Sequence, residues 1–169
     1  MRSRVIGEVM GRGLTRRAVE VLYRERFPRF EQVARAIAGD RELGREAVQE
    51  GFADALRSAD RYDGSGPLEA WVWRCVVNRA KRARRAPGEL LGEPPDVAAK
   101  NGSGEDESGL RARVAALPER QRLAVFLRYY ADLDYAAIAA ALEVEVGTVS
   151  ATLSQAHRNL RAELAKEAR

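Results

Sequence analysis

Apolar residues in the first half of the chain recur every three or four positions, which is the spacing of one helix face. Residues 16–38, 41–58 and 67–85 each follow this pattern, and short stretches rich in glycine, aspartate and proline separate them. The pattern predicts three helices, preceded by a loose tail at residues 1–13. Pro28 lies inside the first helix and should kink or restart it.

The third of these helices has one clear apolar face. Its members fall at i, i+3, i+4, i+7 and i+8 and are Leu68, Trp71, Val72, Cys75 and Val76. A face with this spacing packs against a core. We therefore interpret Trp71 as structural and Cys75 as a small buried hydrophobe rather than a reactive thiol.

The segment from Asp134 to Leu164 predicts two helices joined by a tight turn. Asp134 is a suitable N-cap for a short first helix, and residues 143–146 interrupt the apolar pattern. The second helix has a single apolar stripe, formed by Val149, Leu153, Ala156, Leu160 and Leu164. This arrangement describes a helix-turn-helix, whose second helix fits a DNA major groove. An ordinary helical hairpin inside a bundle fits the same residues equally well.

Residues 87–109 separate the two groups of helices and are too polar to pack. They contain one Lys against six Asp and Glu, whereas residues 1–86 contain 19 Lys and Arg against 12 Asp and Glu. The expected fold is all-α, with two small helical domains joined by a flexible acidic linker, the C-terminal one a helix-turn-helix. The domains are expected at residues 14–86 and 110–169. The basic N-terminal block indicates a polyanionic partner.

A run of cations occupies the end of the third predicted helix. No acidic residue occurs between Glu69 and Glu89, and Trp73 accompanies the cations. The run comprises Arg74, Arg79, Lys81, Arg82, Arg84 and Arg85. Cations beside an exposed aromatic ring suit a nucleic-acid backbone with unstacked bases, although such a run is more often a solvated helix face.

The residue types indicate neither catalysis nor metal binding. Cys75 is the single cysteine, so no internal disulfide can form, and with His157 as the single histidine no metal-ligand set is present. No nucleophile–base pair or glycine-rich phosphate loop is evident, so we expect no enzyme activity and no cofactor. No apolar run approaches the roughly 20 residues that cross a bilayer, and no signal peptide is evident, so we expect a cytoplasmic protein without a membrane partner.

Several short motifs follow one another in a fixed order. Those of the first half are Leu22-Tyr23, Ala47-Val48-Gln49-Glu50-Gly51-Phe52, Arg61-Tyr62-Asp63-Gly64, Ala70-Trp71-Val72-Trp73-Arg74 and Asn78. Those of the second half are Leu117-Pro118-Glu119-Arg120-Gln121-Arg122, Leu127-Arg128-Tyr129, Tyr135-Ala136-Ala137-Ile138-Ala139 and Val146-Gly147-Thr148-Val149. With these motifs in register, the chain resembles the extracytoplasmic-function (ECF) sigma factors, the small two-domain specificity subunits of bacterial RNA polymerase.

The resemblance implies a transcription initiation factor whose partners are core RNA polymerase and promoter DNA. Polymerase would bind Gln49, Glu50 and Phe52. In the resembling proteins a loop matching residues 63–67 holds a flipped base of the −10 element, and cations hold the strand's phosphates. The implied −10 set is Tyr62, Asp63, Trp73, Arg74, Asn78, Arg79, Lys81, Arg82 and Arg85. The implied −35 set, facing a major groove, is Thr148, Ser150, Ala151, Ser154, Gln155, His157 and Arg158.

The chain departs from the family pattern in its last two helices. The recognition helix offers few cations, so fewer phosphate contacts and weaker −35 binding are expected. Glu143 occupies a turn position that is commonly glycine, where a left-handed backbone costs about 1–2 kcal/mol. An alternative is therefore a sigma-like regulator that binds polymerase or a partner protein but not promoter DNA. An anti-sigma protein covering both domains is a further possible partner.

Overall fold

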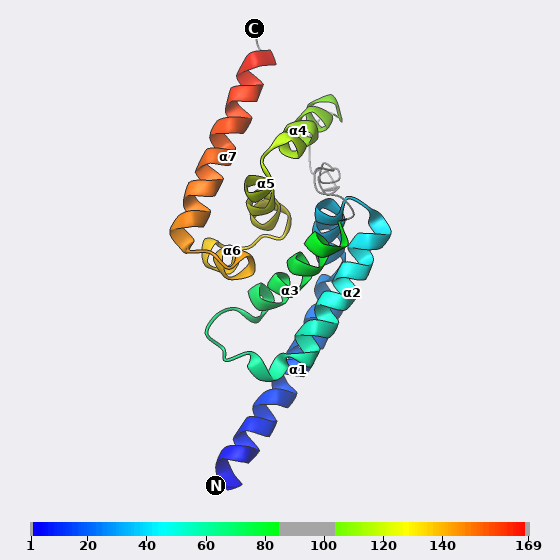
Figure 1. Cartoon of the computed structure of the whole chain (residues 1–169), viewed down its shortest axis with the longest axis vertical. Helices are drawn as coiled ribbons and strands as arrows, with labels where there is room; N and C mark the ends of the chain where they lie inside the picture. The colour runs from blue at the N-terminus through cyan, green and yellow to red at the C-terminus, as the bar shows by residue number, and fades with distance from the viewer. Residues whose placement is uncertain (1, 85–103, 168–169) are drawn as a thin grey trace.

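The structure is a computed structural model that describes residues 2–84 and 104–167, and within these ranges every regular element is helical. No single helix among them is long and apolar enough to cross a membrane, and only α6 with α7, as a bent pair, meets that criterion of length and composition. Figure 1 labels the α-helices. The elements are α1 (Arg2–Ala38), α2 (Arg41–Arg57), the 3₁₀ turn η1 (Ala59–Arg61), α3 (Leu68–Ala83), α4 (Gly104–Ala116), α5 (Glu119–Val125), the π-helical turn η2 (Phe126–Tyr130), α6 (Tyr135–Leu142) and α7 (Val146–Glu167).

The N-terminal domain is a bundle in which α1, α2 and α3 pack against one another (Figure 1). Helix α1 begins at Arg2, so residues 2–13 are helical where the sequence predicted a loose tail. Glycine in a helix interior costs only about 1 kcal/mol, which leaves such a helix permitted. The helix also continues through Pro28 without ending. Asp40 caps α2 as its residue type suggests, accepting a hydrogen bond from the Leu43 backbone N–H at 2.9 Å.

Helices α2 and α3 lie close together at Gly51. A Cβ atom built there would lie 2.7 Å from the Cα of Val76, a distance that requires the backbone to shift. We expect Gly51→Ala to lower the free energy of unfolding by about 1–3 kcal/mol through overpacking, although alanine is the better helix former. Urea unfolding followed by circular dichroism measures this. Gly13→Ala is the matched control, since a Cβ there meets open space, and it should leave stability unchanged or raised. Equal stability of both variants would contradict the close approach.

The C-terminal domain is built from α4 to α7. Helix α4 begins at Gly104, inside the segment expected to be linker. Three acidic residues follow directly, and such residues stabilise the positive end of a helix. The rest of the expected linker up to residue 103 lies outside the described residues, as does Arg85.

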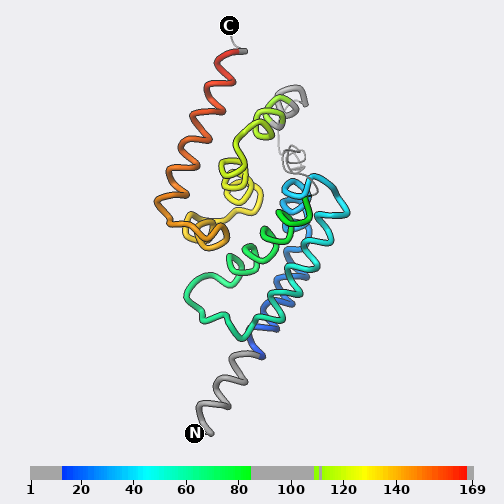
Figure 2. The backbone as a smooth tube through the Cα atoms, viewed as in Figure 1, coloured from blue at the N-terminus to red at the C-terminus, as the bar shows by residue number. Residues whose placement is uncertain are grey.

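The last two helices form a helix-turn-helix rather than a hairpin. The Asp134 side chain caps α6 by accepting a hydrogen bond from the Ala137 N–H at 2.7 Å. The chain bends by 102° between α6 and α7, which lies within the range of helix-turn-helix motifs and far from the near-antiparallel packing of a hairpin. The turn contains Glu143 in the left-handed conformation, at φ 57° and ψ 47°, as its position indicated. Figure 2 shows the backbone path through this bend.

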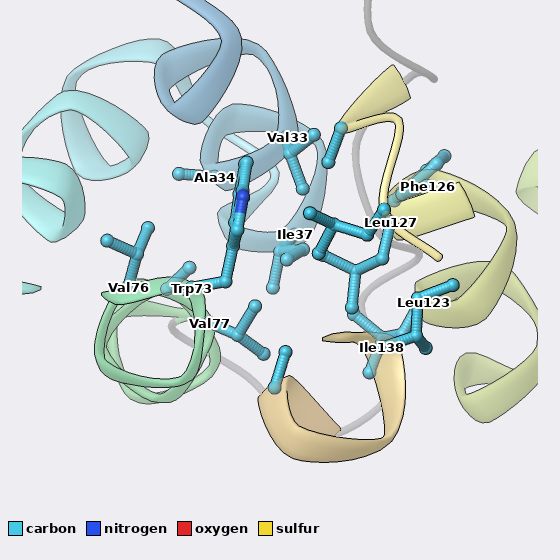
Figure 3. Close-up of a cluster of buried hydrophobic side chains, with 14 of the residues drawn as sticks. Val33, Ala34, Ile37, Trp73, Val76, Val77, Leu123, Phe126, Leu127 and Ile138 are labelled. Carbon is cyan, nitrogen blue, oxygen red and sulfur yellow. The ribbon is translucent and has the colours of Figure 1, made fainter. Parts of the chain in front are cut away.

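The two domains share one hydrophobic core. Helix α3 contacts α6, and α1 contacts η2. In Figure 3 the buried side chains of Val33, Ile37 and Val77 from the first domain gather beside Leu127 and Ile138 from the second. This burial removes apolar surface of both domains from water, and thus favours their association.

Candidate nucleic-acid interface

The loop between η1 and α3 is held in shape by its own hydrogen bonds. The Tyr62 hydroxyl donates to the Gly66 carbonyl at 2.6 Å, and the Ser65 N–H donates to Oδ1 of Asp63 at 2.9 Å. Hydrogen bonds from Ser65 also hold the pKa of the Asp63 carboxyl below its ordinary value. Gly64 has φ +76°, a conformation that glycine adopts without strain. The loop is therefore preorganised, which lowers the entropy cost of binding a ligand.

This loop and the start of α3 enclose a cavity of about 210 Å³. The rings of Tyr62 and Trp71 lie on it, with their centroids 5.5 Å apart and their planes tilted by 44°. Charged and aromatic groups thus meet in one cavity, a combination that suits an unstacked base and its phosphate. The lining residues are Arg61, Tyr62, Asp63, Ser65, Gly66, Pro67, Trp71, Arg74 and Ala140.

The prediction that Trp73 contacts DNA is wrong. Its side chain is 0% exposed and stacks on Phe30, with ring centroids 3.9 Å apart. Trp71, which the apolar pattern assigned to the core, does pack against the core cluster but is only partly buried, and it also lines the cavity. The two tryptophans exchange roles because α3 packs against α1 and α2 on one side and against α6 on another. The buried residues of α3 are Ala70, Val72, Trp73, Val76, Val77 and Ala80.

Arg79 is not an open phosphate-binding cation. Its Nε and Nη2 donate to the two carboxylate oxygens of Asp54 at 2.5 and 2.9 Å, and its Nη1 donates to Glu50 at 2.7 Å. Both acidic residues lie on α2. A bidentate arginine–carboxylate pair fixes orientation as well as charge. Arg79 therefore ties α3 to α2, and this correction removes it from the −10 set.

The Asp54 carboxylate should make the free energy of unfolding depend on pH in the acidic range. The Arg79 hydrogen bonds hold the pKa of Asp54 below its ordinary value. The pair therefore stabilises the fold above the unfolded pKa of about 3.9, and this contribution is lost as the pH falls through the lowered folded value. We expect Asp54→Asn to lower the urea midpoint at pH 7 and to flatten its decline below pH 4. Glu46→Gln, an exposed carboxylate of the same helix, is the control and should change neither.

The cations at the end of α3 divide into exposed and engaged groups. Lys81 and Arg82 are exposed and make no salt bridge within residues 2–84 and 104–167. Arg74 is partly exposed at the cavity, where its Nη1 lies 3.6 Å from Oε1 of Glu143. Asn78 is partly buried. Among the described residues predicted to hold phosphates, Lys81 and Arg82 are the two that remain open to solvent.

The outer face of α7 is open, as the sequence predicted. Thr148, Ser150, Ala151, Ser154 and Arg158 are exposed, and Gln155 and His157 are partly exposed. Gln155 is held on both sides, because it donates to Asn159 at 3.0 Å and accepts from Arg158. His157 makes a hydrogen bond of 2.8 Å with the hydroxyl of Tyr129, which is 56% exposed. The face is more polar than basic.

The residues predicted to bind polymerase lie at the α2 surface, with one correction. Gln49 and Glu50 are exposed. Phe52 is only 3% exposed and makes edge contacts with the rings of Tyr23 and Phe30, so it belongs to the core. Its outer edge forms part of a groove of about 320 Å³ between α1 and α2, which Gln49 also lines.

No metal site is built within the residues that the structure describes. No three histidine, cysteine, aspartate or glutamate side chains gather there as ligands. Burial raises the pKa of the Cys75 thiol, which disfavours the thiolate that both nucleophilic attack and metal binding require.

Two family models match this chain. "Sigma-70 region 2" matches residues 22–88, and "Sigma-70, region 4" matches residues 109–160. The ECF RNA polymerase sigma-E factors of Escherichia coli K12 and Salmonella typhi are each 29% identical over an alignment of 133 positions, which covers 66% of this chain and 68% of the relative. The chain belongs to the ECF sigma factors. The RNA polymerase sigma-H factor of Pseudomonas aeruginosa is 29% identical over 136 residues, covering 69% of this chain and 70% of that protein.

The fold of this sigma factor also matches a solved structure. CnrH, in a structure with the cytosolic domain of CnrY, superposes with a TM-score of 0.69 at 20% identity, covering 95% of this chain and 96% of that one. The region 2 match begins within α1 and extends past α3, and the region 4 match begins within α4 and ends within α7.

Three residues of the interface were not found by sequence reasoning. Trp71 was assigned to the core, although its place directly after the loop could have suggested a cavity residue. Tyr129 was identified only as part of a motif, and no sequence signal indicates its hydrogen bond with His157. Ala140 carries no signal at all, because its place on the cavity depends on the packing of α6 against α3.

Proposed function

We propose that this sigma factor directs core RNA polymerase to a particular promoter set, with the loop 62–67 and α3 binding the melted −10 strand and α7 binding the −35 element. One observation carries the proposal. The cavity between Tyr62 and Trp71 lies at the start of the same helix that ends in the exposed Lys81 and Arg82. Once a strand has access to the cavity, a base can lie in it against the two rings while the phosphates of the strand follow the helix.

The proposed −10 residues differ from those expected from sequence. Trp71 replaces Trp73 as the aromatic contact, and Tyr62, Asp63 and Arg74 line the cavity. Asn78 stays in the proposed set as a partly buried residue further along α3. The proposed −35 residues are those of the open α7 face, with Tyr129 added because it positions His157.

Two proteins are proposed as partners of this sigma factor. Core polymerase binds α2 through Gln49 and Glu50. A separate anti-sigma protein is a second proposed partner, and the complex of CnrH with CnrY gives its fold-level precedent. The proposed action involves no catalysis and takes place in the cytoplasm.

A second candidate is a sigma-like regulator that binds polymerase or a partner but not promoters. The observation that favours it is the polar recognition face, on which Arg158 is held by Gln155. The exposed Lys81 and Arg82 favour the first candidate, because cations that make no salt bridge among the described residues suit a polyanionic partner.

Run-off transcription on a genomic fragment library, with core polymerase and with or without this protein, separates the two candidates. The proposal expects new start sites that share two upstream elements. Binding to polymerase without new starts would support the regulator, and binding to neither would contradict both. Trp71→Ala is a useful companion, because it should keep polymerase binding yet lose the new starts.

A further inference from the structure

Helix α6 of the C-terminal domain closes one side of the −10 cavity. Ala140 lies on the cavity together with Tyr62 and Trp71 of the N-terminal domain. Helix α6 reaches this position because it packs directly on α3. A DNA strand entering the cavity must therefore share the site with the helix-turn-helix domain.

Arg74, one of the two arginines that line the cavity, is also in contact with the C-terminal domain. Oε1 of Glu143 lies 3.6 Å from Nη1 of Arg74, and both side chains are partly exposed, at 61% and 39%. A carboxylate at this place offers the guanidinium the same anionic oxygens that a DNA phosphate would offer. Strand and carboxylate thus compete for Arg74.

Glu143 adopts a backbone conformation that does not favour a glutamate. It ends α6 with φ 57° and ψ 47°, in the left-handed region where glycine is free of strain. A residue retained at such a position needs a contribution from elsewhere. The structure offers two contributions: the backbone hydrogen bonds of Glu143 and Val144 to the Ala139 carbonyl, and the side-chain contact of Glu143 with Arg74.

Other contacts hold the same arrangement. Nη1 of Arg84 lies 3.9 Å from Oε2 of Glu119, and Nη1 of Arg29 donates to the Ala131 carbonyl at 3.3 Å. The apolar cluster of Figure 3 adds buried contacts between the same two domains. Closure is thus maintained by the whole interface, with Glu143 as its contact at the DNA site.

The closed arrangement affects the two DNA sites differently. The α7 face of Thr148, Ser150 and Ser154 remains exposed while α6 covers the cavity. Occlusion should therefore act on −10 binding and leave −35 binding unchanged. Comparing the affinities for the −10 strand and the −35 duplex therefore distinguishes occlusion of the cavity from a general change in DNA binding.

We propose that the C-terminal domain of this sigma factor inhibits its own −10 site, with Glu143 acting on Arg74 as a phosphate mimic and α6 as the wall that excludes the strand. The domains must separate before the strand enters. The inference rests on the proposed function, which makes the cavity a DNA-binding site, but the packing of the two domains can be measured without DNA.

The test uses the full chain with Glu143→Gln, which keeps the side chain's size and removes its charge. Glu145→Gln is the matched control, an exposed glutamate of the same turn with no salt bridge within the described residues. The first readout is an interdomain distance, measured between spin labels at Glu46→Cys and Ala162→Cys in a Cys75→Ala background. Both labelled positions are exposed. Glu143→Gln should increase the population at longer distances, and Glu145→Gln should not.

The second readout is binding of the unpaired −10 strand from a promoter found by the transcription assay. Glu143→Gln should bind it roughly twofold to fivefold more tightly, the range of an exposed ion pair, while duplex −35 binding stays unchanged. An unchanged distance distribution would overturn the proposal, as would domain opening without tighter strand binding. If no variant and no holoenzyme initiates transcription, the proposed function fails instead, whatever the distances show.

Discussion

Replacing Trp73 with alanine should remove a large share of the folding stability rather than weaken DNA binding alone. The side chain is fully buried and stacked on Phe30 with an interplanar angle of 23°. Truncating a buried tryptophan to alanine costs about 3–5 kcal/mol, which is a large share of the 5–15 kcal/mol that stabilises a typical domain. Chemical unfolding of the full chain, followed by far-ultraviolet circular dichroism, measures the loss.

Two further variants separate the structural role of Trp73 from a DNA contact. Trp73→Phe keeps the aromatic stacking and removes an indole N–H that is buried without a partner, so it should retain most of the stability. Trp71→Ala removes a partly exposed ring of the cavity and should fold with a much smaller loss of stability. A folded Trp73→Ala protein that lost only −10 binding would contradict the buried placement.

Reversing the charge of Lys81 and Arg82 together should abolish open-complex formation while leaving the fold intact. Both side chains are exposed at the end of α3. The slope of log affinity against log salt concentration becomes shallower by about one for each phosphate contact that is lost. The two glutamates would also repel the strand. Binding of single-stranded promoter DNA at several salt concentrations measures the slope, and permanganate footprinting of the holoenzyme reports melting.

The matched control reverses the charge of Arg16 and Arg17. These exposed residues of α1 precede the packed part of the bundle, and the double variant has the same net charge. It should keep open-complex formation. An equal loss in both variants would mean that overall charge, rather than the position of Lys81 and Arg82, drives binding. Normal melting with the Lys81 and Arg82 variant would remove α3 from the proposed strand path.

Local sequence signals determined the course of the helices. Asp40 and Asp134 cap the helices that their side chains indicated, because a capping hydrogen bond needs only residues three positions away. The single apolar stripe of α7 was equally readable, since Val149, Leu153 and Ala156 are all buried. The left-handed turn at Glu143 followed from the family resemblance, in which this turn position is commonly glycine. Each of these features depends on neighbours along the chain.

The tertiary structure alone decided which side chains of α3 meet the core. The apolar spacing assigned Trp71 to the core face and left Trp73 off that face, yet Trp73 is the more deeply buried of the two. Trp73 is buried because its ring stacks on that of Phe30, which lies on a different helix. The sequence likewise predicted Arg79 as an open cation, and only the packing of α2 beside α3 shows that Asp54 binds it. The contact of Ala140 and Glu143 with the −10 cavity depends on two domains that the sequence shows only as separate, because packing between distant segments leaves no local periodic signal.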